Sequence, residues 1–440
     1  MINHSRIQDY KKYLHVIPVL IGITFSALAI WAYGVEKIEF GDTNDYINAA
    51  NSFLNHTDYP LRSEFHPMFR PPLFPYFIAV VWLVFPKSIL AIKLFQTLLH
   101  AGTIFIAFKT VYEITRQHIP AFFGSLVVAV NPLLVAHTVD FYTEPLHTFL
   151  CISAMFLLVK FLQNDRHLLL KAFYTGVVFG LATLCRPAML GVAVCLIAAL
   201  VILQFKEKQR VKYMFACGVM FFSIFLTIAP WTYHNYRQTG EFILVNDGFS
   251  YNLWLGNLPG TIKLYEETFT SKEENQAFAN YYWGTVQIEK LKELEQTDNY
   301  SSLKFNEKEK VWRREALKDL TADYNLTARL MIGKLQAFWT PFLNRLTYGD
   351  KVVNLVGFFV IATYIFGIYG MYLFWKDRTG RKYVVLLIIT FVITTLIHVL
   401  IFGFVRYRVP NVDPYLSMLT GVALWQITRK LFPKIINYED

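Results

Sequence analysis

The first long apolar run of the chain covers residues 14–34 and reads LHVIPVLIGITFSALAIWAYG. A hydrocarbon core about 30 Å thick is crossed by about 20 helical residues, so a run of this length predicts a membrane-spanning helix. Basic residues precede the run and no small-residue cleavage pattern closes it, which predicts an uncleaved first span. The polar, acidic stretch that follows is then expected on the outer side of the membrane.

Similar apolar runs recur along the chain and are separated by polar or basic connections. The run at residues 72–86 is bounded by prolines and too short to cross comfortably, so its aromatic residues predict a helix at the membrane interface. The fold class predicted is an all-α polytopic membrane protein of roughly ten spans, at residues 14–34, 88–110, 120–139, 145–162, 171–205 (a hairpin of two), 211–231, 352–375, 382–405 and 411–427.

Composition and charge distribution agree with this interpretation. Hydrophobic residues make up 55% of the 440 residues and charged residues 17%, whereas soluble domains carry about 45–50% and about 25%. Residues 232–350 contain 14 basic and 16 acidic side chains, and the rest of the chain contains 28 and 16. The excess of +12 outside residues 232–350 lies mainly in short connections, the positive-inside pattern of membrane proteins. The net charge of +10 therefore does not point to nucleic acid as a partner.

Three parts are expected along the chain. Residues 1–231 form an N-terminal transmembrane module with a first external loop at 35–87, residues 232–350 form a large external region, and residues 351–440 form a C-terminal transmembrane module. The pattern predicts that both termini are cytoplasmic and that the external parts face outward. A bacterial inner membrane is the expected location. The cysteines all lie in apolar runs and predict neither disulfides nor a zinc site: Cys151, Cys185, Cys195 and Cys217.

The external region is not of low complexity. Residues 241–257 combine β-branched and aromatic residues with Gly and Asn, which predicts a short hairpin or an ordered loop. Residues 271–339 are mostly helical by pattern, with charged faces that are most simply explained as solvated.

The first external loop carries the first candidate site residues. If a helix begins near Thr43, Asp42 would be its N-cap and Asp45 would lie in its first turn, which is a structural role. The position of the two carboxylates at an outer membrane surface equally permits a catalytic base or a metal site. His66 and Arg70 follow just before a proline pair, where Arg70 could simply extend its charged end to the interface.

Further charged residues stand at predicted outer ends of spans. Glu144 could be a first-turn acid favoured by the helix dipole, or it could have a partner, for which Arg186 is a candidate. Arg406 and Arg408 lie on the outer side, against the positive-inside preference. They could anchor at the interface, pair with Asp413 or Glu144, or bind an anionic group such as phosphate.

Six motifs, in this order, resemble those of the GT-C glycosyltransferases. The closest resemblance is to the bacterial protein O-mannosyltransferase-like proteins of glycosyltransferase family 39, with the aminoarabinose lipid A transferases as more distant relatives. The motifs are GDxxxY from Gly41, RPPLFP from Arg70, YTEPL from Tyr142, GLATLCRP from Gly180, YNLWLGN from Tyr251 and RYRVP from Arg406.

This resemblance implies a polyprenyl-phosphate sugar as donor, an active site at the outer membrane face and Asp42 as the catalytic carboxylate. Many relatives have Asp-Glu at the start of the first motif, whereas here Thr43 takes the second place. Whether Asp45 compensates for the missing acid is left open. The large external loop adds further candidates through its motif: Tyr251, Asn252, Trp254 and Asn257.

The residue types suit glycosyl transfer independently of the resemblance. An attacking hydroxyl needs a base, for which Asp42 is the candidate, and such a base typically contributes about 10²–10⁴-fold. Arginines can oppose the charge that develops on a departing phosphate, and direct displacement inverts the anomeric centre. Candidates for the phosphate are Arg186, Arg406 and Arg408; second-line catalytic or acceptor-binding candidates are Asp45, His66, Arg70 and Glu144.

Cofactor, acceptor and alternative functions remain open at this stage. The sequence requires no cofactor, although a divalent metal at Asp42 and Asp45 is conceivable, and the acceptor could be a lipid, a glycan or a protein. A membrane transporter or lipid flippase is the main alternative, and a structural scaffold is the third. Transporters commonly show inverted repeats and ionisable groups near the membrane midplane, whereas here the charged candidates gather at outer span ends.

Overall fold

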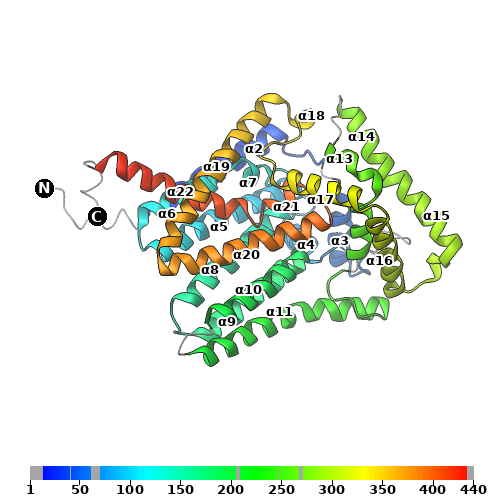
Figure 1. Ribbon diagram of the computed structural model, residues 1–440, viewed down its shortest axis with the longest axis horizontal. Coiled ribbons are helices and arrows are strands. Elements are labelled where there is room, and N and C mark those ends of the chain that lie inside the picture. The colour runs from blue at the N-terminus through cyan, green and yellow to red at the C-terminus, as the bar shows by residue number, and fades with distance from the viewer. Residues whose placement is uncertain are drawn as a thin grey trace.

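The computed structural model describes residues 13–39, 41–60, 70–204, 209–246, 248–266 and 271–433, and the regular structure within these ranges is helical. Figure 1 shows long helices running along the longest axis of the molecule, with the end of α22 at its left and the helices α14 to α16 at its right. We call the left end, where α5 and α8 finish, the basic end. The opposite end, which carries α3 and helices α12 to α18, is the loop end.

Within the described ranges, seven helices are long and apolar enough to cross a membrane: α2 (Val16–Tyr33), α5 (Ile89–Thr115), α8 (Glu144–Gln163), α9 (Leu168–Cys185), α11 (Arg210–Thr239), α19 (Asp350–Lys376) and α20 (Arg378–Leu400). The other three predicted spans correspond to helices that are shorter or more polar: α6 (His118–Ala129), α10 (Ala188–Gln204) and α22 (Asp413–Leu431). The polytopic all-α fold class is therefore confirmed, and the count of ten spans stays a prediction.

Close approach between helices depends on glycines. A Cβ on Gly176 of α9 would lie 2.2 Å from the carbonyl oxygen of Met220 in α11. A Cβ on Gly421 of α22 would lie 2.2 Å from the carbonyl oxygen of Phe123 in α6. Small residues of this kind let helices pack closely where apolar surroundings offer no hydrophobic driving force between them. Gly421 thus lets α22 pack closely on α6, and residues 413–423 of α22 are buried.

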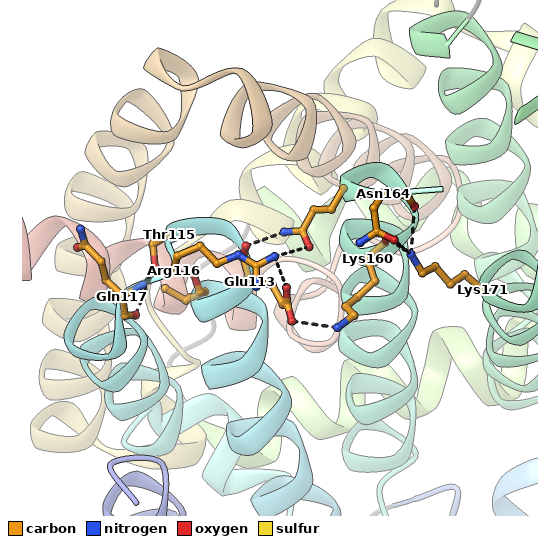
Figure 2. Close-up of polar contacts among 9 residues, drawn as sticks. Glu113, Thr115, Arg116, Gln117, Lys160, Asn164 and Lys171 are labelled. Carbon is orange, nitrogen blue, oxygen red and sulfur yellow. Dashed lines mark hydrogen bonds and ion pairs between the residues drawn. The ribbon is translucent and has the colours of Figure 1, made fainter. Parts of the chain in front are cut away.

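At the basic end, charged side chains join the ends of α5, α8 and α9 (Figure 2). Glu113 accepts a bond from Lys160 at 3.0 Å and lies 2.9 Å from Arg116. Lys171 donates to the carbonyl oxygens of Lys160 and Asn164. Basic residues at two connections, α5–α6 and α8–α9, thus gather at the same end of the bundle, as the charge pattern predicts.

The loop end begins with α3 (Thr43–Asn55) and α4 (Leu73–Val84), the latter within the run predicted as an interfacial helix. The external region is mostly helical, which confirms the prediction for residues 271–339. Its longer helices are α12 (Phe249–Gly256), α14 (Lys272–Asn280), α15 (Val286–Asp298), α16 (Phe305–Ala322) and α17 (Tyr324–Trp339), and its shorter ones are α13 (Lys263–Glu266) and α18 (Arg345–Tyr348). The short helix α21 (Val405–Arg408) follows α20 and faces this region.

The alternative of a hairpin at residues 241–257 is wrong. Backbone carbonyls of this stretch accept bonds from side chains of α11 instead of pairing with a second strand. Trp231 donates to Val245, and Asn235 donates to both Ile243 and Val245, over 2.9–3.1 Å. The stretch is therefore an ordered loop against α11 that leads directly into α12.

Candidate functional site

The acids of the first external loop converge on one arginine. Arg70 donates from Nη2 to Asp42 Oδ1 at 2.6 Å, and from Nε and Nη2 to Asp45 Oδ2 at 3.0 and 2.8 Å. Asp42 occupies the N-cap position of α3, but its side chain makes no capping bond. The predicted N-cap position of Asp42 is confirmed, but its side chain does not cap: its backbone is in the αR region instead of the extended region usual for a capping residue, and its Oδ1 accepts from Arg70. This acidic group of Asp42, Asp45 and Arg70 has a formal charge of −1.

The surroundings of the acidic group determine the charge of Arg70 and the protonation of Tyr46. Burial alone would lower the pKa of Arg70, but the nearby Tyr46, Asp42 and Asp45 raise that pKa above its ordinary value. The Arg70 guanidinium therefore stays charged. It lies 5.5 Å from the ring centroid of Tyr46, and burial raises the pKa of Tyr46 to about 12. That phenol is consequently a hydrogen-bond donor at neutral pH.

A second group is basic and is built around Glu144 at the start of α8. Glu144 Oε1 accepts from Arg186 Nη2 at 2.5 Å and from Arg406 Nε at 2.9 Å. Arg186 also donates to the hydroxyl of Thr143 from Nε and Nη2. The predicted pairing of Glu144 with Arg186 is confirmed. Arg406, which lies 220 positions after Arg186 in the sequence, binds the same carboxylate oxygen. The basic group has a formal charge of +1.

An aromatic ring fixes the two arginines further. The guanidinium carbons of Arg186 and Arg406 lie 5.7 and 5.5 Å from the ring centroid of Tyr407, which stacks on His398 with centroids 4.6 Å apart. Cations at this distance are attracted to the ring face. Burial alone would lower the pKa of Arg406, but Glu144 and the other acidic groups facing it raise that pKa above its ordinary value. Arg406 is thus a permanent cation.

Both groups line one cavity of about 240 Å³. Asp42 and Arg70 of the first group and Arg186 and Arg406 of the second are among its lining residues. Further polar groups come from widely separated parts of the chain: His147, Asn246, Asn252, His398, Tyr407 and Asn411. The cavity therefore combines a carboxylate with two arginines, as the sequence predicts for these residues.

Arg408 does not line this cavity. Its side chain is fully buried, and it donates to Asp413 at 3.0 Å and to the carbonyl oxygens of Phe338 and Thr340 at 3.2 and 2.9 Å. It also donates to the hydroxyl of Tyr364. These contacts join α21 to α17, α19 and α22. Of the alternatives that the sequence left open, the structure therefore agrees with the pairing of Arg408 with Asp413. The other candidate, His66, lies outside the described residues.

The motif in the large loop divides between the cavity and the packing of the external region. Asn252 lines the cavity. Tyr251 and Trp254 are buried against Trp312 of α16, with ring centroids 5.1 and 4.6 Å away. Asn257 donates to Leu400 O at 2.8 Å, which ties the loop to the end of α20. Three of the four motif residues thus hold α12 in place.

Asn257 has a second partner that the sequence does not reveal. It accepts a bond of 2.7 Å from Lys334, a lysine of α17 with no exposed surface. The segment that leads to Arg406 runs directly past this pair, because a Cβ on Gly403 would lie 2.1 Å from Lys334 O. The pair therefore supports the segment that carries Arg406.

Two residues that hold the segment before Asp42 were not identified from the sequence, namely Lys93 and Asp140. Lys93 is buried inside α5 and donates to the carbonyl oxygens of Gly34 and Lys37, both at 2.8 Å. Asp140 accepts from the hydroxyl of Tyr33 at 2.7 Å and from the Glu39 backbone at 2.8 Å. Together they hold the segment just before Asp42. A lysine within an apolar run needs a partner, and that signal could have identified Lys93.

The acidic group is a poor match for a metal ion in the described structure. Within the described ranges, no three His, Cys, Asp or Glu side chains gather as ligands. Asp42 and Asp45 share a guanidinium, so a divalent ion bound to both would have to displace Arg70. The arginine already supplies the positive charge between the two carboxylates.

Comparisons with known proteins agree with the fold. A family model described as dolichyl-phosphate-mannose-protein mannosyltransferase matches residues 69–233. None of the curated proteins matches the sequence significantly. Among solved structures, the chain is similar to the archaeal oligosaccharyltransferase AglB from Archaeoglobus fulgidus in complex with an inhibitory peptide and a dolichol-phosphate. The TM-score is 0.57 at 14% identity, over 96% of this chain and 51% of that one.

Two further structures of an Archaeoglobus fulgidus oligosaccharyltransferase are similar, both with a TM-score of 0.56 and 14% identity over 96% of this chain. One is tethered with an acceptor peptide containing the NVT sequon, and the other is a complex with Zn and sulfate. The chain spans about half the length of the solved structures that it matches. At this identity the likeness shows the fold, and the family model supports the resemblance over residues 69–233.

Proposed function

We propose that this protein is an integral membrane glycosyltransferase that moves a sugar from a polyprenyl-phosphate-linked donor to an acceptor hydroxyl. The observation that carries the proposal is that Asp42, Arg186 and Arg406 line the same cavity. The matched family model, which is named for a dolichyl-phosphate-mannose donor, supports a lipid-linked sugar. The basic end faces the cytoplasm, as the positive-inside rule favours, so the cavity opens at the outer face of a bacterial inner membrane.

In this reaction the donor phosphate binds between Arg186 and Arg406. Their guanidinium groups share one carboxylate oxygen of Glu144, so the basic group keeps one positive charge for the ligand. As the bond between the anomeric carbon and the phosphate oxygen breaks, its electron pair stays on the phosphate. Cations already placed there stabilise that charge without reorganisation.

Asp42 acts on the acceptor. It takes the proton of the attacking hydroxyl while the new carbon–oxygen bond forms on the face opposite the departing phosphate, which inverts the anomeric centre. Asp45 receives two of the three Arg70 bonds and so orients the arginine, while Asp42 is held by one. Asp42 is therefore the more readily released of the two carboxylates.

The test is the substitution Asp42→Asn, which keeps the size and removes the basicity. Sugar transfer by purified protein should fall about 10²–10⁴-fold, the usual contribution of a general base. Binding of the lipid phosphate should remain, because its arginines are untouched. Asp58→Asn, at an exposed acid of the same end, is the control and should transfer normally.

Normal transfer by the Asp42→Asn variant would overturn the catalytic assignment. The transporter or flippase alternative predicts a different result, namely movement of a lipid-linked sugar across vesicles by purified protein without any transfer. That outcome would replace the proposed function.

A further inference from the structure

A second cavity lies at the loop end, with a volume of about 610 Å³. We propose that it binds a neutral saccharide chain of the acceptor, an inference that rests on the proposed glycosyl transfer and names its acceptor class. Four side-chain amides line the cavity, together with the ring of Phe404: Asn275, Gln276, Asn280 and Asn344. The size falls in the range of about 300–1,000 Å³ that is usual for small-molecule sites.

The chemistry of the lining selects for hydroxyl groups. A carboxamide offers two donor hydrogens and an acceptor oxygen, and a sugar hydroxyl both donates and accepts. Among the described residues that line the cavity, none is charged, so it offers no counter-charge for an anionic ligand. Its apolar side chains are Leu264 and Phe404, which is too little to enclose a lipid tail.

Phe404 adds aromatic surface to the cavity, and its side chain is only partly buried. Its ring stacks on Tyr265 and on Phe402, with centroids 6.1 Å apart in both pairs. The negative face of an aromatic ring attracts the polarised C–H groups on the flat side of a sugar. Amides around such a ring are therefore a saccharide-binding arrangement.

The same segment connects this cavity to the first one. Phe404 lines the second cavity, whereas its stacking partner Phe402 lines the first, beside Arg406 and Tyr407. One stacked pair of rings thus contributes to both cavities. An acceptor glycan can thus present its terminal hydroxyl near Asp42 while a more distant sugar unit occupies the amide-lined cavity.

The experiment measures binding of neutral probes to the full chain in lipid nanodiscs by saturation-transfer NMR. The probes are the trisaccharides maltotriose and cellotriose, and a neutral tripeptide is the competitor, because amides can also bind a peptide backbone. The double variant Gln276→Leu/Asn280→Leu removes two exposed amides of the cavity. Gln296→Leu, an exposed amide of α15 outside the cavity, is the matched control.

At least one trisaccharide should bind the wild type and the control equally and bind the double variant about tenfold more weakly, which corresponds to about 1.4 kcal/mol. Lipid-phosphate binding should be the same in all three proteins, which checks that they are folded. Absence of trisaccharide binding, equal binding by the double variant, or displacement by the tripeptide would overturn the inference. No donor is needed, so the result is independent of whether Asp42→Asn abolishes transfer.

Discussion

Replacing Glu144 with Gln tests how the basic group is held together. The Glu144 side chain is 1% exposed and shares one oxygen between two arginines, so the substitution leaves two neighbouring cations without their counter-charge. Removing one partner of a buried ion pair costs about 3–5 kcal/mol. The side chains of Arg186 and Arg406 are 14% and 27% exposed, and both line the cavity. Water can hydrate them there, so we expect a loss near 3 kcal/mol.

A lipid phosphate should partly reverse this loss, because it supplies the missing negative charge and binds only the folded state. The measurement is chemical denaturation in mixed micelles followed by tryptophan fluorescence, with and without farnesyl phosphate. Saturating farnesyl phosphate should reduce the difference in unfolding free energy between wild type and Glu144→Gln by about 1.5–3 kcal/mol, the size of a hydrogen bond to a charged group.

The matched control is Glu113→Gln at the basic end, where a carboxylate also lies between two cations (Figure 2). Arg116 and Lys160 are 59% and 38% exposed, so the loss should be at most about 1 kcal/mol, and farnesyl phosphate should not reduce it. An equal effect of farnesyl phosphate on both variants, or no effect on Glu144→Gln, would refute the assignment of the basic group to phosphate.

Three further predictions concern the framework. Arg408→Met should lower the free energy of unfolding by about 3–5 kcal/mol in denaturation experiments and leave the KM for the donor unchanged, because its pair with Asp413 is fully buried and away from the cavity. Gly421→Ala should destabilise by about 1–3 kcal/mol through backbone overlap, whereas Gly218→Ala, with open space around its Cβ position, should not. Burial lowers the pKa of Lys334 from 10.5 to about 7, so above pH 7 the unfolded chain binds a proton that the folded protein lacks. The stability of the wild type relative to Lys334→Met should therefore rise from pH 7 to pH 9, and a fall would contradict the assignment.

Much of the architecture follows from features that act locally. An apolar run of sufficient length must be helical in a membrane, so the span positions could be predicted from residue counts. The pairing of Glu144 with Arg186 was also predictable, since an acid at membrane depth needs a partner.

The difference between Arg406 and Arg408 could not be predicted in this way. Residues two positions apart on a helix lie on different faces, so one arginine reaches Glu144 and the other reaches Asp413. Which face meets the cavity depends on how α21 packs, and that is set by distant segments. The bonds from Arg70 to Asp42 and Asp45 could not be predicted either. Arg70 lies 28 positions after Asp42, and only tertiary packing brings the two side chains together.

The anchoring of the segment before Asp42 has a practical consequence for anyone who extracts this protein. Lys93 of α5 donates to backbone carbonyls just after α2, and Asp140 accepts from the Tyr33 hydroxyl at the end of α2. The helix α2 itself has little protein contact, since only 22% of its apolar window is buried. A harsh detergent that separates α2 from its neighbours would displace the carboxylate of Asp42, the proposed base, while the remaining helices stay assembled. Solubilised protein should then lose activity at temperatures below its unfolding transition. In milder surfactants or with added phospholipid, the inactivation temperature should rise to the unfolding temperature.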